Sequence, residues 1–439
     1  MPNKATGSGF YGWWLLPILC LVYSIPIGFA LYGPPVINTY MTKALGWERG
    51  QINLGYTIIG IVLGMGALFI PFLINRFGPR KTLAIGAVLT AASGLLMALC
   101  GQVYPAYLIL CFFAGLGISF GSVLPVQTLV LYWFNAHRAL AMGLVLGGGA
   151  IGGFIYPQII SACIINFGGD WRIGWYVIAI TCFLGAIIAM IAVRNRPEDL
   201  GQHPDGLSPQ QLREAILHAK HKPIRTYRSP VNWKFRDAVR TSSLWMIIAA
   251  TGLIFFLWQA VMTQTTFHLR DVGFSPEDPV IFLRPEFVYG MILACSIIGR
   301  LSVSFLGERI ESRFLISIAG FSLIIGGVLF LLASKDNLWA VYLFPLFTGF
   351  GFGATYVSVP LITGNYFGAG AFPSISAITN PVGAVFQFSS PFIAGWMYDI
   401  NGNYDLAMLI GCSGALIGTV VILFCKPPQP GRDTVFSNN

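Results

Sequence analysis

Only 10% of the 439 residues are charged and 55% are hydrophobic, with a mean hydropathy of +0.71. Soluble domains carry about 25% charged residues, so this composition excludes a soluble globular chain and predicts an all-α integral membrane protein. The formal net charge of +9 does not indicate nucleic-acid binding, because the basic residues gather on one side of the predicted spans.

Twelve apolar runs are long enough to cross a bilayer as helices, which takes about 20 residues each. In chain order they cover residues 11–33, 53–74, 82–101, 106–133, 139–165, 175–193, 243–267, 286–307, 314–334, 338–364, 372–398 and 405–425. With the N-terminus inside, nineteen of the 26 Lys and Arg residues fall on the cytoplasmic side, six fall on the other side, and Arg300 lies within a span. The positive-inside rule therefore predicts that both termini are cytoplasmic.

A single long polar stretch, residues 195–242, divides the spans six and six. We therefore expect an N-terminal half (1–194), a cytoplasmic linker (195–242), a C-terminal half (243–425) and a cytoplasmic tail (426–439). Within the linker, residues 208–211 (SPQQ) are typical of a helix start. The following residues 212–222 predict a short basic amphipathic helix, either on the membrane surface or solvated.

The two halves share a sequence repeat at an offset of 233 to 234 residues. Three patterns recur: Phe72-Leu73-x-x-Arg76-x-x-x-Arg80 as Phe305-Leu306-x-x-Arg309-x-x-x-Arg313, Phe113-x-Gly115-x-Gly117 as Phe347-x-Gly349-x-Gly351, and Trp133-Phe134 as Tyr366-Phe367. A duplicated six-helix unit with both copies in one orientation is the organisation of transporters with parallel halves.

Several stretches resemble a known family. The loop from Asn75 to Lys81 (NRFGPRK) looks like the signature between helices 2 and 3 of the major facilitator superfamily, with Asn75 and Pro71 replacing the signature's Asp and leading Gly. Residues 133–143, 196–201 and 268–273 are similar to the bacterial branch of monocarboxylate porters and oxalate/formate antiporters. The resemblance implies a twelve-helix fold with two six-helix halves.

Arg300 is the one basic residue well inside a span, where a charge costs several kcal/mol and usually serves a function. Its repeat-related position is the apolar Ala67, so the charge belongs to one half only. Ser296 shares its helix face. The resemblance implies that Arg300 binds a substrate carboxylate and that the aromatic pair Phe352 and Tyr356 lines the binding site. The alternative is that Arg300 extends towards the cytoplasm near Glu308.

Within this branch, monocarboxylate porters often have Asp or Asn where Ser296 stands. Antiporters of oxalate carry a Lys in helix 11, whereas residues 378–383 here contain no basic residue. A single cation therefore favours a monoanion over a dicarboxylate, whose second charge would be unpaired.

Other polar groups within or beside the spans are weaker candidates for the site. Tyr32 precedes Gly33-Pro34-Pro35, where the first helix is expected to break. Asn380 and Gln264 are candidate ligands, or equally bonds between helices. His268 and Asp399 are candidates for proton coupling, or ordinary interfacial residues and helix caps.

The sequence predicts a secondary active transporter of a small monocarboxylate such as lactate, pyruvate, acetate or formate. Alternating access, coupled to proton symport, is the expected mechanism. The alternatives are an organic-anion exchanger of the oxalate/formate type or a porter for another small metabolite and, more remotely, a non-transporting membrane receptor. No metal-ligand spacing, cofactor motif or nucleophile–base pair predicts an enzyme, and the eight Cys residues all fall in spans as packing residues. We expect a monomer in a bacterial inner membrane.

Overall fold

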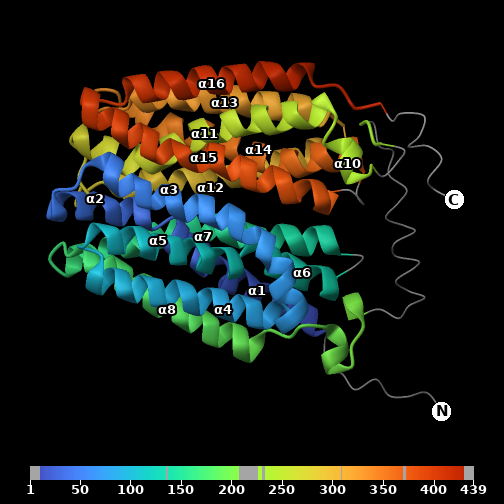
Figure 1. Cartoon of the computed structure of the whole chain (residues 1–439). Helices are drawn as coiled ribbons and strands as arrows, with labels where there is room; N and C mark the ends of the chain where they lie inside the picture. Colours follow the sequence, from blue (N-terminus) through green and yellow to red (C-terminus); the bar gives the residue numbers. More distant parts are fainter. Residues whose placement is uncertain are drawn as a thin grey trace, which may run out of the picture.

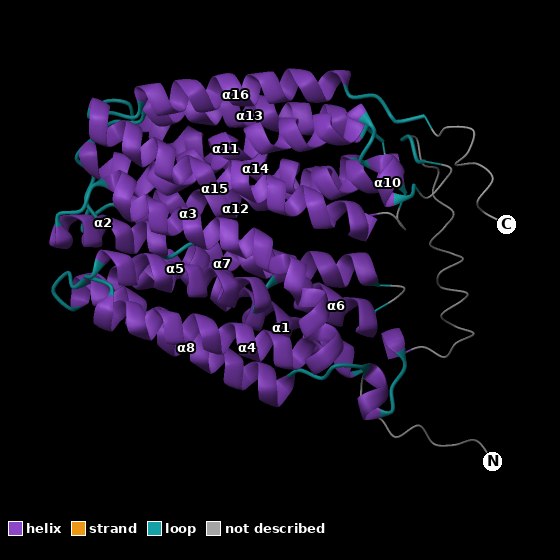
Figure 2. Ribbon diagram, viewed as in Figure 1, coloured by secondary structure: helices purple, strands orange, loops and turns teal. Residues whose placement is uncertain are grey.

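The computed structural model describes residues 10–134, 137–206, 226–229, 233–307, 309–368 and 372–429. These residues form helices and loops and no strand (Figures 1 and 2). The helices of the N-terminal half are α1 (Tyr11–Ile25), a π-helix (Pro26–Leu31), α2 (Pro34–Leu45), α3 (Arg49–Gly66), a 3₁₀ turn (Ala67–Phe69), α4 (Ile70–Cys100), α5 (Tyr104–Phe120), α6 (Val123–Trp133), α7 (Arg138–Asn166) and α8 (Trp171–Ala192).

The C-terminal half follows two 3₁₀ turns (Pro197–Leu200 and Pro204–Gly206) and the short α10 (Phe235–Ala238). Its helices are α11 (Ser242–Asp271), a 3₁₀ turn (Ile281–Leu283), α12 (Pro285–Leu306), α13 (Ser312–Leu332), α14 (Leu338–Phe367), α15 (Phe372–Asn401) and α16 (Asp405–Phe424). The amphipathic helix predicted at residues 212–222 lies outside the described residues.

The described helices supply the twelve spans. Ten helical stretches are long and apolar enough to cross a membrane, and one of them is the 52-residue run Arg49–Cys100. A straight helix of that length would be about 78 Å long, more than twice the hydrocarbon thickness. The backbone turns at Gly78 (φ 79°, ψ 158°), which divides the run into two spans. With α15, which is 30 residues long, the total is twelve.

Two predicted spans differ from the structure in their limits. The first continues past residue 33, because the Gly33-Pro34-Pro35 stretch bends the chain without ending it, and α2 extends to Leu45. The predicted span 106–133 is two helices, since the chain breaks at Gly121 and Ser122 between α5 and α6.

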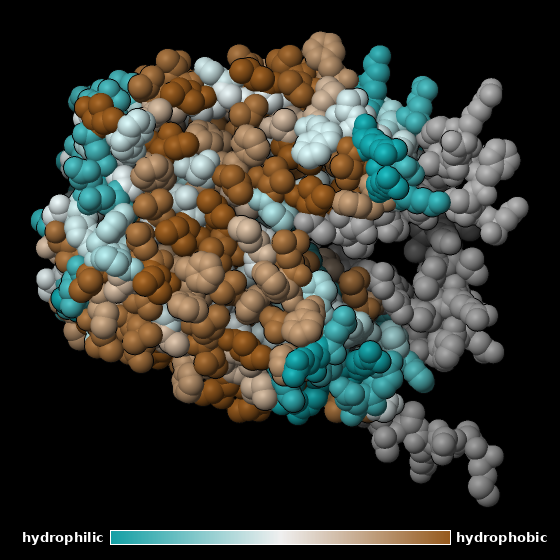
Figure 3. All heavy atoms as spheres, in the orientation of Figure 1, coloured by the Kyte–Doolittle hydropathy of each residue, from teal (hydrophilic) through white to brown (hydrophobic). Residues whose placement is uncertain are grey.

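The surface has the distribution of polarity that a bilayer requires. In Figure 3 apolar residues cover the middle of the visible face, and hydrophilic residues gather at the two ends. Large apolar side chains such as Phe72, Phe305 and Phe424 are more than 60% exposed. Exposed apolar area of this extent is stable only against lipid, as expected for a multi-pass membrane protein.

The sequence repeat corresponds to repeated packing. A Cβ on Gly115 in α5 would lie 2.6 Å from the carbonyl oxygen of Ile59 in α3, and a Cβ on Gly349 in α14 would lie 2.2 Å from that of Ile292 in α12. Ile59 and Ile292 are themselves 233 residues apart. In both halves, therefore, glycine lets the same pair of helices approach at the same level.

The repeated arginines also have equivalent partners. Arg80 donates from Nη2 to the carbonyl of Met190 at the end of α8, and Arg313 donates from Nη1 to the carbonyl of Leu423 at the end of α16, at 3.5 Å. Met190 and Leu423 are again 233 residues apart. Each arginine anchors its loop within its own half.

The two halves lie side by side, the first lower and the second upper in Figure 1, and meet through α3 against α15 and α7 against α12. We call the end with residues 10 and 429 the terminal end, and the opposite end the α2 end. In the described residues, no hydrogen bond between the halves lies nearer the terminal end than Arg300. The bonded pairs include Arg49–Asp271, Arg49–Tyr404, Arg49–Asp399, Gly50–Asp399, Pro35–Thr266, Tyr32–Tyr289, Thr57–Phe392 and Leu146–Arg300. The α2 end of the bundle is therefore the closed end.

Candidate functional site

Arg300 lies on α12, about 22 Å along the helix from Pro285. Its Nη1 donates to the carbonyl of Leu146 in α7, at 3.3 Å, so the guanidinium points across the interface into the other half. Its Nε is buried without a hydrogen-bond partner. None of the ion pairs among the described residues includes Arg300. Glu308, the carboxylate named in the alternative reading, lies outside the described residues.

Two aromatic rings of α14 lie beside this guanidinium. The Arg300 Cζ is 5.0 Å from the Tyr356 ring centroid and 5.7 Å from that of Phe352. Glycines bring α14 this close: a Cβ on Gly353 would lie 1.9 Å from the carbonyl oxygen of Ser296, and one on Gly299 would lie 2.1 Å from that of Phe350. The aromatic faces attract the cation and present an apolar wall beside it.

The N-terminal half contributes tyrosines to the same region. Tyr32 follows the π-helix, and its carbonyl accepts a hydrogen bond from the Tyr289 hydroxyl at 2.9 Å. Its ring lies against Gly153 of α7. Both Tyr32 and Tyr23 lie within electrostatic range of Arg300 and of Tyr356. The structure thus brings Arg300, Phe352, Tyr356 and Tyr32 together.

Of three other predicted ligands, two make hydrogen bonds to other groups of the protein and one is exposed. Ser296 is fully buried, and its hydroxyl donates to the carbonyl of Leu293 in its own helix at 2.6 Å. Gln264 donates to the carbonyl of Pro391 at 3.3 Å and accepts from the Tyr404 hydroxyl at 3.1 Å. Asn380 is an exposed residue of α15. In this structure the Gln264 side chain joins α11 to α15 and to Tyr404, whereas the Ser296 hydroxyl bonds within its own helix. The roles of Ser296, Gln264 and Asn380 as ligands stay predictions.

The two predicted coupling residues lie near the α2 end. The Nε2 atom of His268 is 3.2 Å from the Ala333 carbonyl, and its ring is 4.4 Å from that of Phe330. Asp399 accepts the backbone N–H of Arg49 at 3.0 Å and of Gly50 at 2.6 Å. These are the first two residues of α3, whose N–H groups have no partner within the helix. A carboxylate of the C-terminal half therefore caps a helix of the N-terminal half.

Several residues of the site were not predicted. The Leu146 carbonyl accepts from Arg300, and the Tyr23 ring lies against Gly149, one turn further along α7. Trp258 stacks on Phe352 with ring centroids 3.7 Å apart. The Trp258 Nε1 is buried without a partner. Aromatic residues are common in membrane helices and every residue has a carbonyl, so no sequence signal distinguishes these positions.

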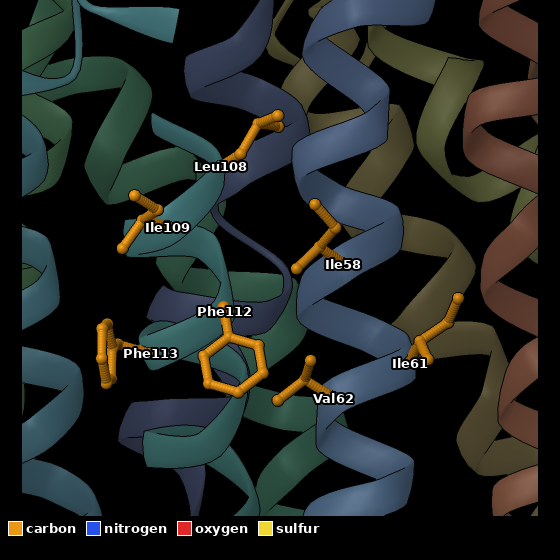
Figure 4. Close-up of a pocket in the computed structure, with 7 residues that line it drawn as sticks. All are labelled: Ile58, Ile61, Val62, Leu108, Ile109, Phe112 and Phe113. Carbon is orange, nitrogen blue, oxygen red and sulfur yellow. The ribbon is translucent and has the colours of Figure 1, made fainter. Parts of the chain in front are cut away.

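A separate apolar groove of about 620 Å³ lies between α3 and α5. Figure 4 shows its lining, which includes Ile58, Val62, Ile109 and Phe112. Ile109 is 59% exposed and the lining has almost no polar surface, so the groove faces lipid and is not the candidate site. Among the described residues, no group of His, Cys, Asp and Glu could hold a metal ion.

Twelve helical spans in two related halves, with an arginine at their interface, define a multi-pass membrane transporter. The chain belongs to the Major Facilitator Superfamily, whose family model matches residues 18–391. Its proteins are transporters and not enzymes.

The chain is similar to several curated transporters. It is 23% identical to monocarboxylate transporter 12 of Xenopus laevis over 80% of this chain and 75% of that one, and 22% identical to the probable sulfoacetate transporter SauU of Cupriavidus necator over 94% and 93%. The agnestins efflux protein AgnL12 of Paecilomyces divaricatus is 29% identical, but the match covers only 43% of this chain and 44% of that protein.

The fold is also similar to solved structures. The nucleoside transporter NupG superimposes with a TM-score of 0.69 at 13% identity, over 94% of this chain and 100% of that chain. Identity this low shows the shared fold alone.

Proposed function

We propose that this protein is a secondary active transporter of a small monocarboxylate, such as lactate, pyruvate, acetate or formate. The observation that supports this proposal best is the position of Arg300, which extends from one half to the other beside two aromatic rings. A guanidinium presents a planar pair of donors that matches a carboxylate. The named substrates of the monocarboxylate and sulfoacetate transporters above are likewise small organic anions.

The substrate is a monoanion on this proposal. Arg300 is the basic residue that the described chain brings to the site, and the side chains around it are aromatic or aliphatic. A second carboxylate would be desolvated there with no second cation to balance its charge, at a cost of several kcal/mol. Formate, acetate, lactate and pyruvate avoid this cost, whereas oxalate and succinate do not.

The transport cycle would be a rocking of residues 1–194 against residues 243–425 about this site. We propose that the terminal end faces the cytoplasm of a bacterial inner membrane, as the positive-inside rule predicts, and that the protein works as a monomer. In this orientation the closed α2 end is the outer end. Substrate would then exchange with the cytoplasmic side in the conformation described here.

Proton symport is the proposed coupling, and Asp399 is its better-supported site. Its carboxylate caps α3 across the interface, and protonation would remove the charge that the helix N-terminus attracts. A proton from outside would thus favour opening of the outer end. His268 is the second candidate, and exchange of anions is the alternative mode.

Uptake of radiolabelled lactate into proteoliposomes tests the proposal. We expect uptake to be accelerated by an inward proton gradient and to fall by about a hundredfold in Arg300→Ala. Arg300→Lys keeps the positive charge but loses the planar pair of guanidinium donors, so it should retain part of the wild-type uptake. Arg172→Ala is the matched control, because Arg172 is an exposed arginine near the start of α8, paired with Asp170.

Unchanged uptake in Arg300→Ala would contradict the assignment of Arg300. Competition by formate, acetate and pyruvate but not by oxalate is expected for a monoanion site. Uptake that requires vesicles preloaded with an anion, and that ignores the proton gradient, would replace symport by exchange.

A further inference from the structure

Two tyrosines of the N-terminal half remain unexplained by carboxylate binding. Tyr23 is 4% exposed and Tyr32 is 7% exposed, yet neither hydroxyl has a hydrogen-bond partner among the described residues. Neither hydroxyl oxygen is among the fully buried unpartnered atoms, so both still border accessible space. Buried tyrosines normally find a partner for the hydroxyl. Two unpaired donors beside one arginine therefore indicate a polar ligand.

The π-helix explains why both tyrosines reach the same region. They are nine residues apart, which is about 2.5 turns of an α-helix, so an unbroken α-helix would point them in opposite directions. Residues 26–31 between them are wound as a π-helix, which turns less per residue and rotates Tyr32 towards the side of Tyr23.

One face of α7 holds these side chains. Leu146, Gly149 and Gly153 recur at spacings of three and four and so share a face. The Leu146 carbonyl accepts from Arg300, a Cβ on Gly149 would lie 2.7 Å from the Tyr23 ring, and one on Gly153 would lie 2.8 Å from the Tyr32 ring. The two glycines therefore leave the space that the tyrosine rings occupy.

We infer that the substrate carries a second oxygen beside its carboxylate, and that Tyr23 and Tyr32 bind this oxygen from the N-terminal half while Arg300 binds the carboxylate from the C-terminal half. This inference rests on the proposed function and narrows it to 2-hydroxy and 2-oxo monocarboxylates. A phenol donates to a keto oxygen and exchanges a hydrogen bond with a hydroxyl. It adds no charge, so the match with a monoanion is kept.

The arrangement also provides selectivity. A site built to hydrogen-bond a substrate hydroxyl rejects the analogue without it, because its own polar groups are then left unpaired. A substrate held by both halves would, in addition, link binding to their movement. Acetate and propionate would make the Arg300 contact and leave the tyrosines unpaired.

The test compares lactate with propionate, which differ by one hydroxyl. Values of kcat/KM for both acids are measured in proteoliposomes for the wild type, Tyr23→Phe, Tyr32→Phe and a control, Tyr156→Phe. Tyr156 lies on the same helix as the glycines, but its hydroxyl already pairs with that of Ser24 at 2.9 Å. We expect the wild type to prefer lactate by roughly tenfold or more. Each of the two site variants should lower that ratio towards one, because lactate transport falls more than propionate transport, and the control should keep the ratio.

A second variant tests whether a change of selectivity in Tyr23→Phe could come from misfolding. Gly149→Ala displaces the Tyr23 ring without removing its hydroxyl, and the lactate-to-propionate ratio should fall there too. Equal wild-type transport of the two acids would overturn the inference, as would an equal loss of both in the Phe variants. If Arg300→Gln abolishes uptake while the ratio is unaffected by Tyr23→Phe and Tyr32→Phe, only the inference fails. If Arg300→Gln leaves uptake intact, the proposed function fails with it.

Discussion

Arg49 of α3 and Asp271 of α11 form a two-pronged ion pair that joins the halves at the closed end. Nη1 lies 2.7 Å from Oδ2, and Nη2 lies 2.6 Å from Oδ1. The guanidinium also lies 3.7 Å from the ring centroid of Tyr398. The Arg49 and Asp271 side chains are 14% and 31% exposed, so solvent screens them less than an open surface pair.

Neutralising one partner should shift the protein towards the state that is open at this end. We expect Asp271→Asn to raise the open population roughly fivefold, for a loss of about 1 kcal/mol. The exchange variant Arg49→Asp with Asp271→Arg should restore part of the closure. The measurement is labelling of Thr266→Cys by an impermeant maleimide, because Thr266 is buried at the interface beside Pro35.

The matched control for this prediction is Arg172→Ala. It breaks the exposed Arg172–Asp170 pair, which lies within one half, so labelling should stay at the reference level. Identical labelling in Asp271→Asn and the reference would show that the Arg49–Asp271 pair does not hold the end closed.

Asp399 should protect the start of α3 from hydrogen exchange. Its two oxygens accept the N–H groups of Arg49 and Gly50, which would otherwise be unpartnered. In Asp399→Ala we expect deuterium uptake by the first turn of α3 to rise several-fold. Asp405→Ala removes an exposed carboxylate from the first turn of α16 and serves as the control. Unaltered exchange in Asp399→Ala would argue against capping across the interface.

Tyr404 links Arg49 to Gln264, two turns before Asp271 in α11. Its hydroxyl accepts from the Nη1 of Arg49 at 2.5 Å and donates to Oε1 of Gln264 at 3.1 Å. Burial raises the pKa of the Tyr404 hydroxyl far above its usual value of about 10. The hydroxyl therefore stays neutral in the folded protein, and its contribution to stability is lost only as the pH rises above about 10.

We expect Tyr404→Phe to lower the free energy of unfolding by about 1 kcal/mol. The loss should be the same from about pH 5 to pH 9, and should shrink above pH 10, where the unfolded wild type ionises. Thermal unfolding as a function of pH measures this. Tyr342→Phe, at an exposed position of α14, should have little effect at any of these pH values. A loss that varies between pH 5 and pH 9 would contradict a neutral Tyr404.

Gly78 should tolerate no side chain at the break in α4. Its φ of 79° with ψ of 158° belongs to a region open almost only to glycine. A Cβ there would also lie 3.0 Å from Nδ2 of Asn195, which anchors the same loop. We expect Gly78→Ala to destabilise the protein by about 1–3 kcal/mol, measured by thermal unfolding.

Gly143→Ala provides the comparison for Gly78→Ala. Gly143 is helical and no atom lies within 4 Å of its missing Cβ, so this change should be neutral or stabilising by about 0.5–1 kcal/mol. Equal stability of the two variants would mean that the break does not depend on glycine.

Helix α7 is rich in glycine, at residues 147–149, 152 and 153. This abundance predicts close approach of helices, and the structure has it: Gly148 and Gly152 lie against α1. The sequence could not predict that the Tyr23 and Tyr32 rings lie against Gly149 and Gly153. An α-helical period places these two tyrosines on opposite faces of the first helix. The π-helix packs against α7, and such packing between distant segments has no local sequence code.

The residue pairs that join the two halves could not be predicted from the sequence either. Arg49 and Asp271 are 222 residues apart, and Asp399 is 350 residues from Arg49. Charges near the ends of spans are common, so the sequence places them at the membrane surface without pairing them. Asp399 was predicted as a candidate for coupling, whereas Asp271 entered only as part of a family resemblance.

By itself, the sequence determined the number of spans, the duplication and the isolation of Arg300, because the bilayer requires long apolar runs and makes any charge within them conspicuous. Only the tertiary structure decided that Arg300 reaches Leu146, that aromatic rings lie beside it and that the α2 end is closed. Those features depend on how two halves pack together. That packing is the sum of many weak contacts between residues distant in the chain, and no single stretch of sequence encodes it.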